Sequence, residues 1–299
     1  MTINIFRDKL YTLIGYIKSE IKKMKQQKIW FITGASKGMG LLLTKLLLSN
    51  GDKVAATSRN LSQLKENVGI ESESFLPLAV DITKNHSVIE AISHTVEYFG
   101  GLDVVVNNAG FSYIGSVEEL TDEEFRKALD VNLFGAVNVI RVSLSQFRKQ
   151  HSGHIINIAS AAGYIAGANI GSYVTSKFAM VGLTESLALE IAPLNIKATV
   201  VLPGSFRTNF LNEDSLNYAK KPISEYESAK TYKSYADRAG TQPGDPKKLV
   251  VELFNLVNME KPPVHLILGS DSYKMITNKM KTNLQDFENY RLISDSTNF

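Results

Sequence analysis

Short apolar runs alternate with longer segments of three- and four-residue apolar spacing from residue 29 onward. Short runs bounded by glycine or polar residues are typical of buried parallel strands, and the longer spacing is typical of helices. The pattern predicts strands over residues 29–33, 54–57, 74–80, 104–106, 155–159 and 196–202, and a last strand over 265–268. It predicts helices over residues 40–50, 87–99, 121–150 and 172–192.

This alternation predicts an α/β chain with a doubly wound Rossmann fold, in which helices cover both faces of a mainly parallel sheet. Thr121, followed three residues later by Glu124, predicts a capping box at the start of the helix over 121–150. We expect one Rossmann-fold domain over residues 28–270, followed by a C-terminal helical tail over 271–299.

Residues 204–244 interrupt the alternation, because they are polar and have no clear period. So long a stretch inside a compact domain is usually functional, and we expect a lid over about 204–244. Asp245 before Pro246 then predicts a new helix start. Aromatic residues in the lid indicate either an apolar substrate or packing of the lid itself; they are Phe206, Phe210, Tyr218, Tyr226, Tyr232 and Tyr235.

The first 27 residues form a separate segment with a different pattern. Apolar residues recur at helical spacing, with lysines on the other side, at Phe6, Leu10, Leu13, Ile14, Ile17, Ile21 and Met24. The pattern predicts an amphipathic basic extension over residues 1–27. It could lie on an anionic membrane, dock on a partner or pack on its own domain, and Met24 could also be the true start of the chain.

Composition narrows the class of protein. Of 299 residues, 44% are hydrophobic and 21% are charged, as in ordinary globular proteins. The net charge of +3 is concentrated in the first 28 residues, so the remaining chain carries −2 and does not suggest nucleic-acid binding. No uninterrupted apolar run reaches the roughly 20 residues of a membrane span, and no secretory signal is evident, so we expect a cytoplasmic protein.

Cysteine is absent, which excludes disulfides, thiolate catalysis and cysteine-ligated zinc. The five histidines are scattered along the chain, and His151 and His154 are expected to be solvated loop residues. We therefore expect no metal site.

A glycine-rich turn follows the first predicted strand, and a helix follows the turn. Its sequence runs from Thr33 through Gly34, Gly38 and Gly40. Glycines allow the backbone to turn sharply and to approach a ligand closely, and the N-terminus of the helix offers free amides to a diphosphate. The arrangement therefore predicts a dinucleotide site.

The end of the second predicted strand indicates which dinucleotide binds. A site for NAD usually has an acidic residue there, whereas this chain has Thr57, Ser58 and Arg59. Arg59 can pair with a 2′-phosphate, and Lys37 in the glycine-rich turn can contact the same group. We therefore expect NADP(H).

The remaining candidate groups lie near later strand ends. Small residues at 107–110 follow the fourth predicted strand, and Ser160 follows the fifth. Tyr173 and Lys177, four residues apart, share one face of the next helix.

These motifs, in this order, resemble the short-chain dehydrogenase/reductase family, in its shorter single-domain branch. The resemblance covers roughly residues 28–270 and rests on a TGxxxGxG loop, an NNAG segment at 107–110, and Ser160 thirteen residues before the Tyr173 of a YxxxK motif.

The resemblance assigns further residues. It implies that Asn132 is an active-site asparagine, that Pro203, Gly204 and Thr208 hold the nicotinamide carboxamide, and that Asp81 and Ile82 contact the adenine side. The candidate catalytic residues are Asn132, Ser160, Tyr173 and Lys177. The candidate cofactor-binding residues are Gly34, Ser36, Lys37, Gly38, Met39, Gly40, Ser58, Arg59, Asp81, Ile82, Asn108, Ala109, Gly110, Tyr173, Lys177, Pro203, Gly204 and Thr208.

The resemblance also implies a mechanism in which Tyr173 is the general acid and base for hydride transfer between nicotinamide and a carbonyl or secondary alcohol. Tyrosine has an ordinary pKa near 10, and we expect the Lys177 ammonium and the nicotinamide charge to lower that pKa. Lys177 would also bind the nicotinamide ribose, Ser160 would donate to the substrate oxygen, and Asn132 would hold a water that links Lys177 to solvent.

Two further hypotheses of function stay open at this point. One is a non-catalytic dinucleotide sensor or scaffold, and the other is a membrane-associated reductase of lipid or steroid-like substrates. Members of the resembled family are usually dimers or tetramers, so we expect a homodimer or a homotetramer. The family acts on many carbonyl and alcohol compounds, so the sequence does not identify the substrate.

Overall fold

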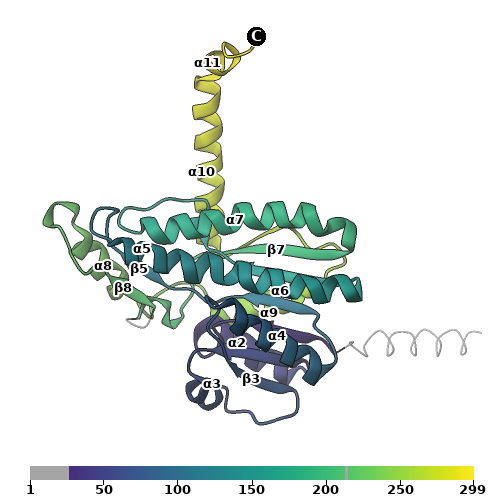
Figure 1. Ribbon diagram of the computed structural model, residues 1–299. Helices are drawn as coiled ribbons and strands as arrows, with labels where there is room; N and C mark the ends of the chain where they lie inside the picture. The colour runs from purple at the N-terminus through teal and green to yellow at the C-terminus, as the bar shows by residue number, and fades with distance from the viewer. Residues whose placement is uncertain (1–26, 213–214) are drawn as a thin grey trace, which may run out of the picture.

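The computed structural model describes residues 27–212 and 215–299 (Figure 1). The predicted amphipathic extension, apart from its last residue, lies outside the described residues. The core is a seven-stranded parallel sheet with the strand order β3-β2-β1-β4-β6-β7-β9. Its strands are β1 Ile29–Ile32, β2 Lys53–Ser58, β3 Phe75–Ala79, β4 Val104–Asn107, β6 Gly153–Ile158, β7 Ile196–Pro203 and β9 His265–Leu268. All seven were predicted, within one or two residues at most ends.

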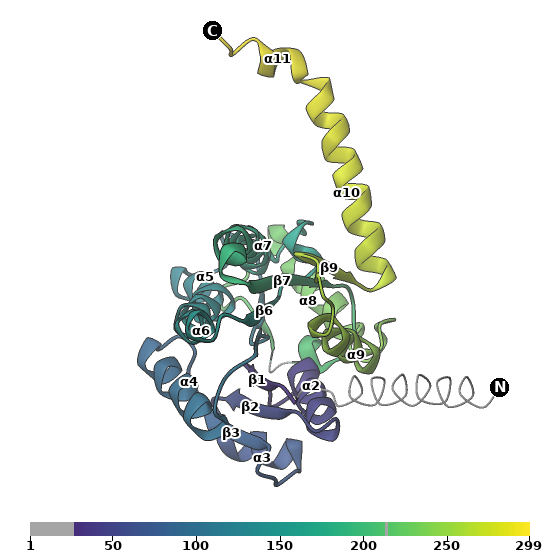
Figure 2. The ribbon, with the colours of Figure 1, turned by 90° about the vertical axis from the view of Figure 1, so that its right-hand side faces the viewer.

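Helices cover both faces of this sheet (Figure 2). Buried residues of α2, α3 and α9 form one core with the sheet, and those of α4, α6 and α7 form a second core on the opposite face. The helices are α2 Gly38–Ser49, α3 Leu61–Val68, α4 Asn85–Phe99, α6 Gly135–Gln150, α7 Gly171–Ile191 and α9 Pro246–Val257. The doubly wound Rossmann fold is therefore confirmed.

The direction of winding changes beside the first strand. β1 pairs with β2 on one side and with β4 on the other, so the chain crosses over between β3 and β4. Open α/β sheets bind ligands outside the carboxyl ends of their strands at such a point. The glycine-rich turn after β1 and the NNAG segment after β4 both begin there.

The helix predicted over residues 121–150 is interrupted. It consists of α5 Asp122–Leu129, a π-helical turn η1 Asp130–Phe134, and α6. Among the described residues, this stretch alone has the length and mean hydropathy, 1.2, of a membrane span. It packs in the protein interior, because Ala128, Val139 and Phe147 are fully buried, as in core helices.

The predicted lid is more regular than its sequence suggests. It contains the short helices η4 Asn209–Leu211 and η5 Ser224–Tyr226, the strand β8 Leu216–Tyr218, and the helix α8 Ser228–Asp237. β8 pairs in parallel with β5 Ser112–Ile114 to form a small second sheet that the hydrophobic pattern did not predict.

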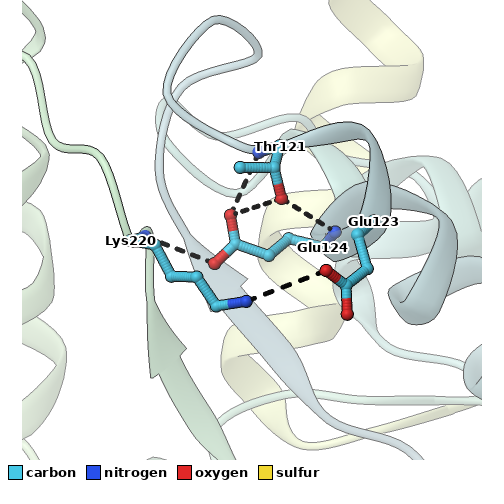
Figure 3. A network of polar contacts seen from close by, with 4 residues as sticks. All are labelled: Thr121, Glu123, Glu124 and Lys220. Carbon is cyan, nitrogen blue, oxygen red and sulfur yellow. Dashed lines mark hydrogen bonds and ion pairs between the residues drawn. The ribbon is translucent and has the colours of Figure 1, made fainter.

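Two buried carboxylates attach the lid to the domain. The predicted capping box is present, since Thr121 accepts from the backbone of Glu124 and the Glu124 side chain accepts from the backbone of Thr121 (Figure 3). The same Glu124 carboxylate accepts from the Lys220 backbone in the lid at 3.2 Å. Glu119 accepts from the backbone of Ile223 at 2.8 Å and from the Ser228 hydroxyl at 2.6 Å.

The chain ends in α10 Ser270–Asn289 and α11 Arg291–Asp295, which project from the domain (Figures 1 and 2). The first turns of α10 are anchored: Ile276 is buried, Ser272 donates to the Leu202 carbonyl, and Asp271 accepts from the Ser205 backbone at 2.7 Å. Farther along, large apolar side chains are exposed; they are Met280, Leu284, Phe287, Tyr290, Leu292 and Ile293.

The expectation of solvated loop histidines was wrong for one of the two. His151 is exposed just after α6, but His154 lies on β6 and is buried. Its Nε2 atom is 3.0 Å from the Thr199 hydroxyl. Burial, with smaller effects of Lys197 and Lys28, lowers the pKa of His154 to about 3, so this ring is neutral.

Candidate active site

A cavity of about 970 Å³ lies along the carboxyl ends of the strands. All the candidate site residues except Gly40 and Asn132 line it. The structure therefore brings the glycine-rich turn, the end of β2, the NNAG segment and the tyrosine–lysine pair to one continuous space.

The glycine-rich turn owes its shape to close backbone contacts. Gly34 has φ +66°, and a Cβ there would lie 2.8 Å from the Ala109 Cα. Gly40 does not line the cavity; a Cβ there would lie 2.6 Å from both Asn108 Nδ2 and the Gly34 carbonyl. Gly40 thus lets α2 pack against the turn, while Gly38, with φ +57°, lines the cavity.

The NNAG segment is tied to the glycine-rich turn. Asn108 Nδ2 donates to the carbonyls of Thr33 and Gly34 at 2.9 and 3.0 Å. The Thr33 hydroxyl accepts from the backbones of Asn108 and Ala109. Sequence analysis identified Asn108 and Ala109 but not the role of Thr33, whose hydroxyl positions both.

The end of β2 carries polar groups on the cavity wall. Ser58 and Arg59 line it beside Lys37, and no carboxylate follows β2 directly. Asp81, at the end of β3, faces the same region. Burial alone would raise the pKa of the Asp81 carboxyl, but hydrogen bonds from Thr83 and the charges of Lys84 and Arg59 lower it overall. Asp81 is therefore ionised at neutral pH.

Tyr173 and Lys177 lie one turn apart on α7. Lys177 is 5% exposed; its Nζ donates to the Ile158 carbonyl at 2.8 Å and lies 5.5 Å from the Tyr173 ring centroid. A Cβ on Gly110 would lie 3.2 Å from the Asn132 Oδ1 atom, so glycine at this position permits a close approach to Asn132. Ser160, just after β6, forms a side-chain hydrogen bond with Tyr173.

Burial controls the acidity of this pair. It raises the pKa of Tyr173 to about 12, although the hydrogen bond with Ser160 opposes the rise. Burial also lowers the pKa of Lys177 to about 8. We expected the Lys177 ammonium and the nicotinamide charge together to lower the pKa of Tyr173; in the protein without a dinucleotide, desolvation of the phenolate places that pKa above its ordinary value.

Asn132 lies behind the cavity, in the π-helical turn η1. Its Oδ1 accepts from the Phe111 backbone at 3.0 Å, and its Nδ2 donates to the Phe111 carbonyl and to the Ser176 hydroxyl. Ser176 in turn donates to the Tyr173 carbonyl at 2.7 Å. The Asn132 side chain thus connects η1 to the start of α7, and its predicted water relay stays a prediction.

The remaining wall is largely apolar. Phe210 stacks at a tilt on Tyr173, with ring centroids 5.7 Å apart, and Phe206 and Tyr235 also line the cavity. Tyr218 and Tyr232 pack under the lid and Tyr226 is exposed, so only some of the lid aromatics line the cavity. The cavity wall also contains apolar residues that the sequence motifs do not identify, among them Phe111, Ile165, Ile170, Leu211 and Met275.

Comparison with known proteins places these features in a family. The model of the short chain dehydrogenase family matches residues 28–219. The chain is 35% identical to oxidoreductase BOA17 of Botryotinia fuckeliana over 250 residues, which are 82% of this chain and 90% of that protein.

Solved structures agree with this match. A short-chain dehydrogenase from Streptomyces avermitilis superposes with a TM-score of 0.84 and 30% identity, covering 92% of this chain and all of that one. ElxO, solved with NADP bound, has a TM-score of 0.67 and 27% identity over 81% of this chain and 96% of its own. The fold is also shared by a Burkholderia phymatum dehydrogenase in complex with NAD, with a TM-score of 0.75 and 20% identity over 88% and 94% of the two chains.

Proposed function

This chain belongs to the short-chain dehydrogenase family, and we propose that it is an NADP(H)-dependent oxidoreductase with Tyr173 as its general acid and base. It would transfer a hydride between nicotinamide and a carbonyl or secondary alcohol carbon. The observation that carries the proposal is that Ser160, Tyr173 and Lys177 meet in the same cavity as the glycine-rich turn.

The residues present fit a dinucleotide. Gly34 and Gly38 have positive φ and line the cavity; a Cβ on Gly34 would clash with the Ala109 backbone, whereas Gly38 leaves its part of the wall without a side chain. The N-terminus of α2 has no capping side chain, and its first residues line the cavity. Free amides at a helix N-terminus bind phosphate oxygens. The turn and α2 would therefore hold the diphosphate.

Preference for NADP(H) over NAD(H) rests on charge. Arg59 and Lys37 on the cavity wall can pair with a 2′-phosphate. Arg59 directly follows β2, at the position where sites for NAD usually have an acidic residue, which would repel that phosphate. Asp81 is ionised, but it accepts hydrogen bonds from the backbone and hydroxyl of Thr83.

Proton transfer falls to Tyr173. When bound, nicotinamide supplies or accepts the hydride. With a pKa near 12 the Tyr173 hydroxyl is protonated at neutral pH, so it can donate a proton to a substrate oxygen as that oxygen gains charge. Ser160 would donate a hydrogen bond to the same oxygen, and Lys177 would stabilise the phenolate that remains.

The apolar wall formed by Phe210, Tyr235 and Met275 favours a substrate with an apolar body. The fold of this family suggests a small-molecule substrate. We also propose a cytoplasmic location. We further propose a homodimer or homotetramer, and sedimentation of the purified chain tests this oligomeric state. A non-catalytic sensor is not favoured, because the tyrosine, lysine and serine are all in place.

The proposal is tested by following oxidation of NADPH and NADH in parallel against ketones and aldehydes that range from small and polar to steroid-sized. We expect NADPH to be consumed faster than NADH with at least one apolar carbonyl compound. Failure to bind either dinucleotide would overturn the proposal.

A further inference from the structure

Gln242 has a buried side-chain oxygen that the described residues do not satisfy. The residue is 5% exposed and lines the cavity. Among residues 27–212 and 215–299, none donates a hydrogen bond to its Oε1 atom. Buried side-chain amides are normally hydrogen-bonded, so an unpartnered oxygen at a cavity wall is a candidate contact for a bound ligand.

The backbone of Gln242 is held firmly. Arg207 donates to the Gln242 carbonyl from Nε at 3.2 Å and from Nη2 at 3.1 Å. The Gly244 backbone donates to Ser205, and the Arg207 backbone donates to Gly244, both at 2.9 Å. A Cβ on Gly244 would lie 2.6 Å from the Phe206 ring, so glycine is needed for this close contact. The backbone of residues 242–244 is thus fixed against residues 205–207, and this fixes the position from which the Gln242 side chain extends.

The segment 205–207 lies along the dinucleotide side of the cavity. It starts directly after Pro203 and Gly204 at the end of β7 and leads into Thr208. The Thr208 Cβ is 3.9 Å from the position of a Cβ on Gly38, so Thr208 borders the glycine-rich turn. Gln242 therefore lies beside the part of the cavity between the diphosphate site and the end of β7.

We propose that Gln242 binds the nicotinamide half of the dinucleotide and accepts a hydrogen bond at Oε1 from its carboxamide N–H or its ribose O–H. Both groups are donors, which the unpartnered oxygen requires. This inference rests on the proposed function, because it takes a nicotinamide dinucleotide as the ligand. It adds a binding residue from the lid side of the cavity, beyond the residues that the motifs identify.

The test compares ligands that contain and lack the nicotinamide half. Binding of NADPH and of adenosine 2′,5′-bisphosphate is measured by titration of the full chain, without any substrate. Gln242→Met keeps the length of the side chain and removes its hydrogen bonds. Gln285→Met is the matched control, because Gln285 is an exposed glutamine on α10 outside the cavity lining, and its Nε2 donates to Asn289.

We expect Gln242→Met to weaken NADPH binding about tenfold, the size of one buried hydrogen bond, and to leave bisphosphate binding unchanged. Gln285→Met should bind both ligands as the wild type does. Unchanged NADPH binding in Gln242→Met, or equal weakening of both ligands, would overturn the inference while leaving the proposed function in place. A wild-type chain that does not bind NADPH would overturn the proposed function and this inference together.

Discussion

The Lys177 ammonium lies 5.5 Å from the ring centroid of Tyr173 and donates to the Ile158 carbonyl. Burial moves the two pKa values apart, up to about 12 for the tyrosine and down to about 8 for the lysine. At neutral pH the tyrosine is therefore an acid beside a cation. This state suits carbonyl reduction, since the phenol gives up its proton as the substrate oxygen becomes negative.

Carbonyl reduction should therefore lose kcat/KM as the pH rises through about 8, because Lys177 becomes neutral there. Its ammonium form prevails below that pH, so the profile should be flat from pH 6 to 7. Lys177→Arg keeps the charge to much higher pH and should remove this decline if the variant folds, which thermal unfolding checks. If kcat/KM of Lys177→Arg declined at the same pH, the decline would have to arise from the titration of a group other than Lys177.

Arg59 should determine the choice between the two dinucleotides. Arg59→Asp removes a cation from the cavity wall and adds an anion that repels a 2′-phosphate. We expect the ratio of NADPH to NADH affinity to fall roughly tenfold to a hundredfold, the size of a charge-assisted hydrogen bond. Titration of both dinucleotides measures the ratio. An unchanged ratio would mean that Arg59 does not contact the phosphate.

Glu119 should stabilise the attached lid. Hydrogen bonds from Ser228, Ser116 and Ile223 outweigh burial and hold its pKa below the ordinary value of 4.5. A lowered pKa gives stability that is present above that value and is lost as the pH falls through the folded-state pKa. Glu119→Gln should therefore lower the free energy of unfolding by about 2 kcal/mol at pH 7.

Urea unfolding at pH 7 and in acid tests this expectation, and the difference should shrink in acid. Glu123→Gln is the control: its carboxylate is exposed and lies 4.0 Å from Lys220 Nζ, so its loss should cost under about 1 kcal/mol. A Glu119→Gln penalty that is equal at both pH values would exclude ionisation of Glu119 as its source.

The end of the C-terminal tail should contribute little to the stability of the domain. Ile276 is buried, whereas Met280, Leu284 and Phe287 are exposed. Truncation after Lys279 should change the free energy of unfolding by less than about 0.5 kcal/mol at low protein concentration. Denaturant titrations of the full and truncated chains measure this change. A clearly lower midpoint for the truncated chain would show that the tail packs more extensively than the structure describes.

Much of the fold was predictable because its signals are local. Each central strand is a short apolar run, and the Thr121 and Glu124 capping box and the Asp245 cap mark helix starts in the sequence itself. The candidate site was accessible for a related reason: parallel strands bring their carboxyl ends to one edge, so residues just after them meet.

The missed features depend on contacts between distant parts of the chain. β5 and β8 are three residues each, and only their pairing makes them strands. The π-helical turn at Asn132 has no local marker, because the amide of that residue is held by Phe111 and Ser176. The raised pKa of Tyr173 arises from burial by the lid and the core, which residue spacing does not show.

The central claim is tested most directly by Tyr173→Phe, which removes only the hydroxyl. Turnover of the best carbonyl substrate and the NADPH dissociation constant are measured side by side in the wild type and the variant. We expect turnover to fall by at least about a hundredfold, the usual contribution of a positioned acid, with NADPH binding nearly unchanged. Near-wild-type turnover in Tyr173→Phe would contradict the account.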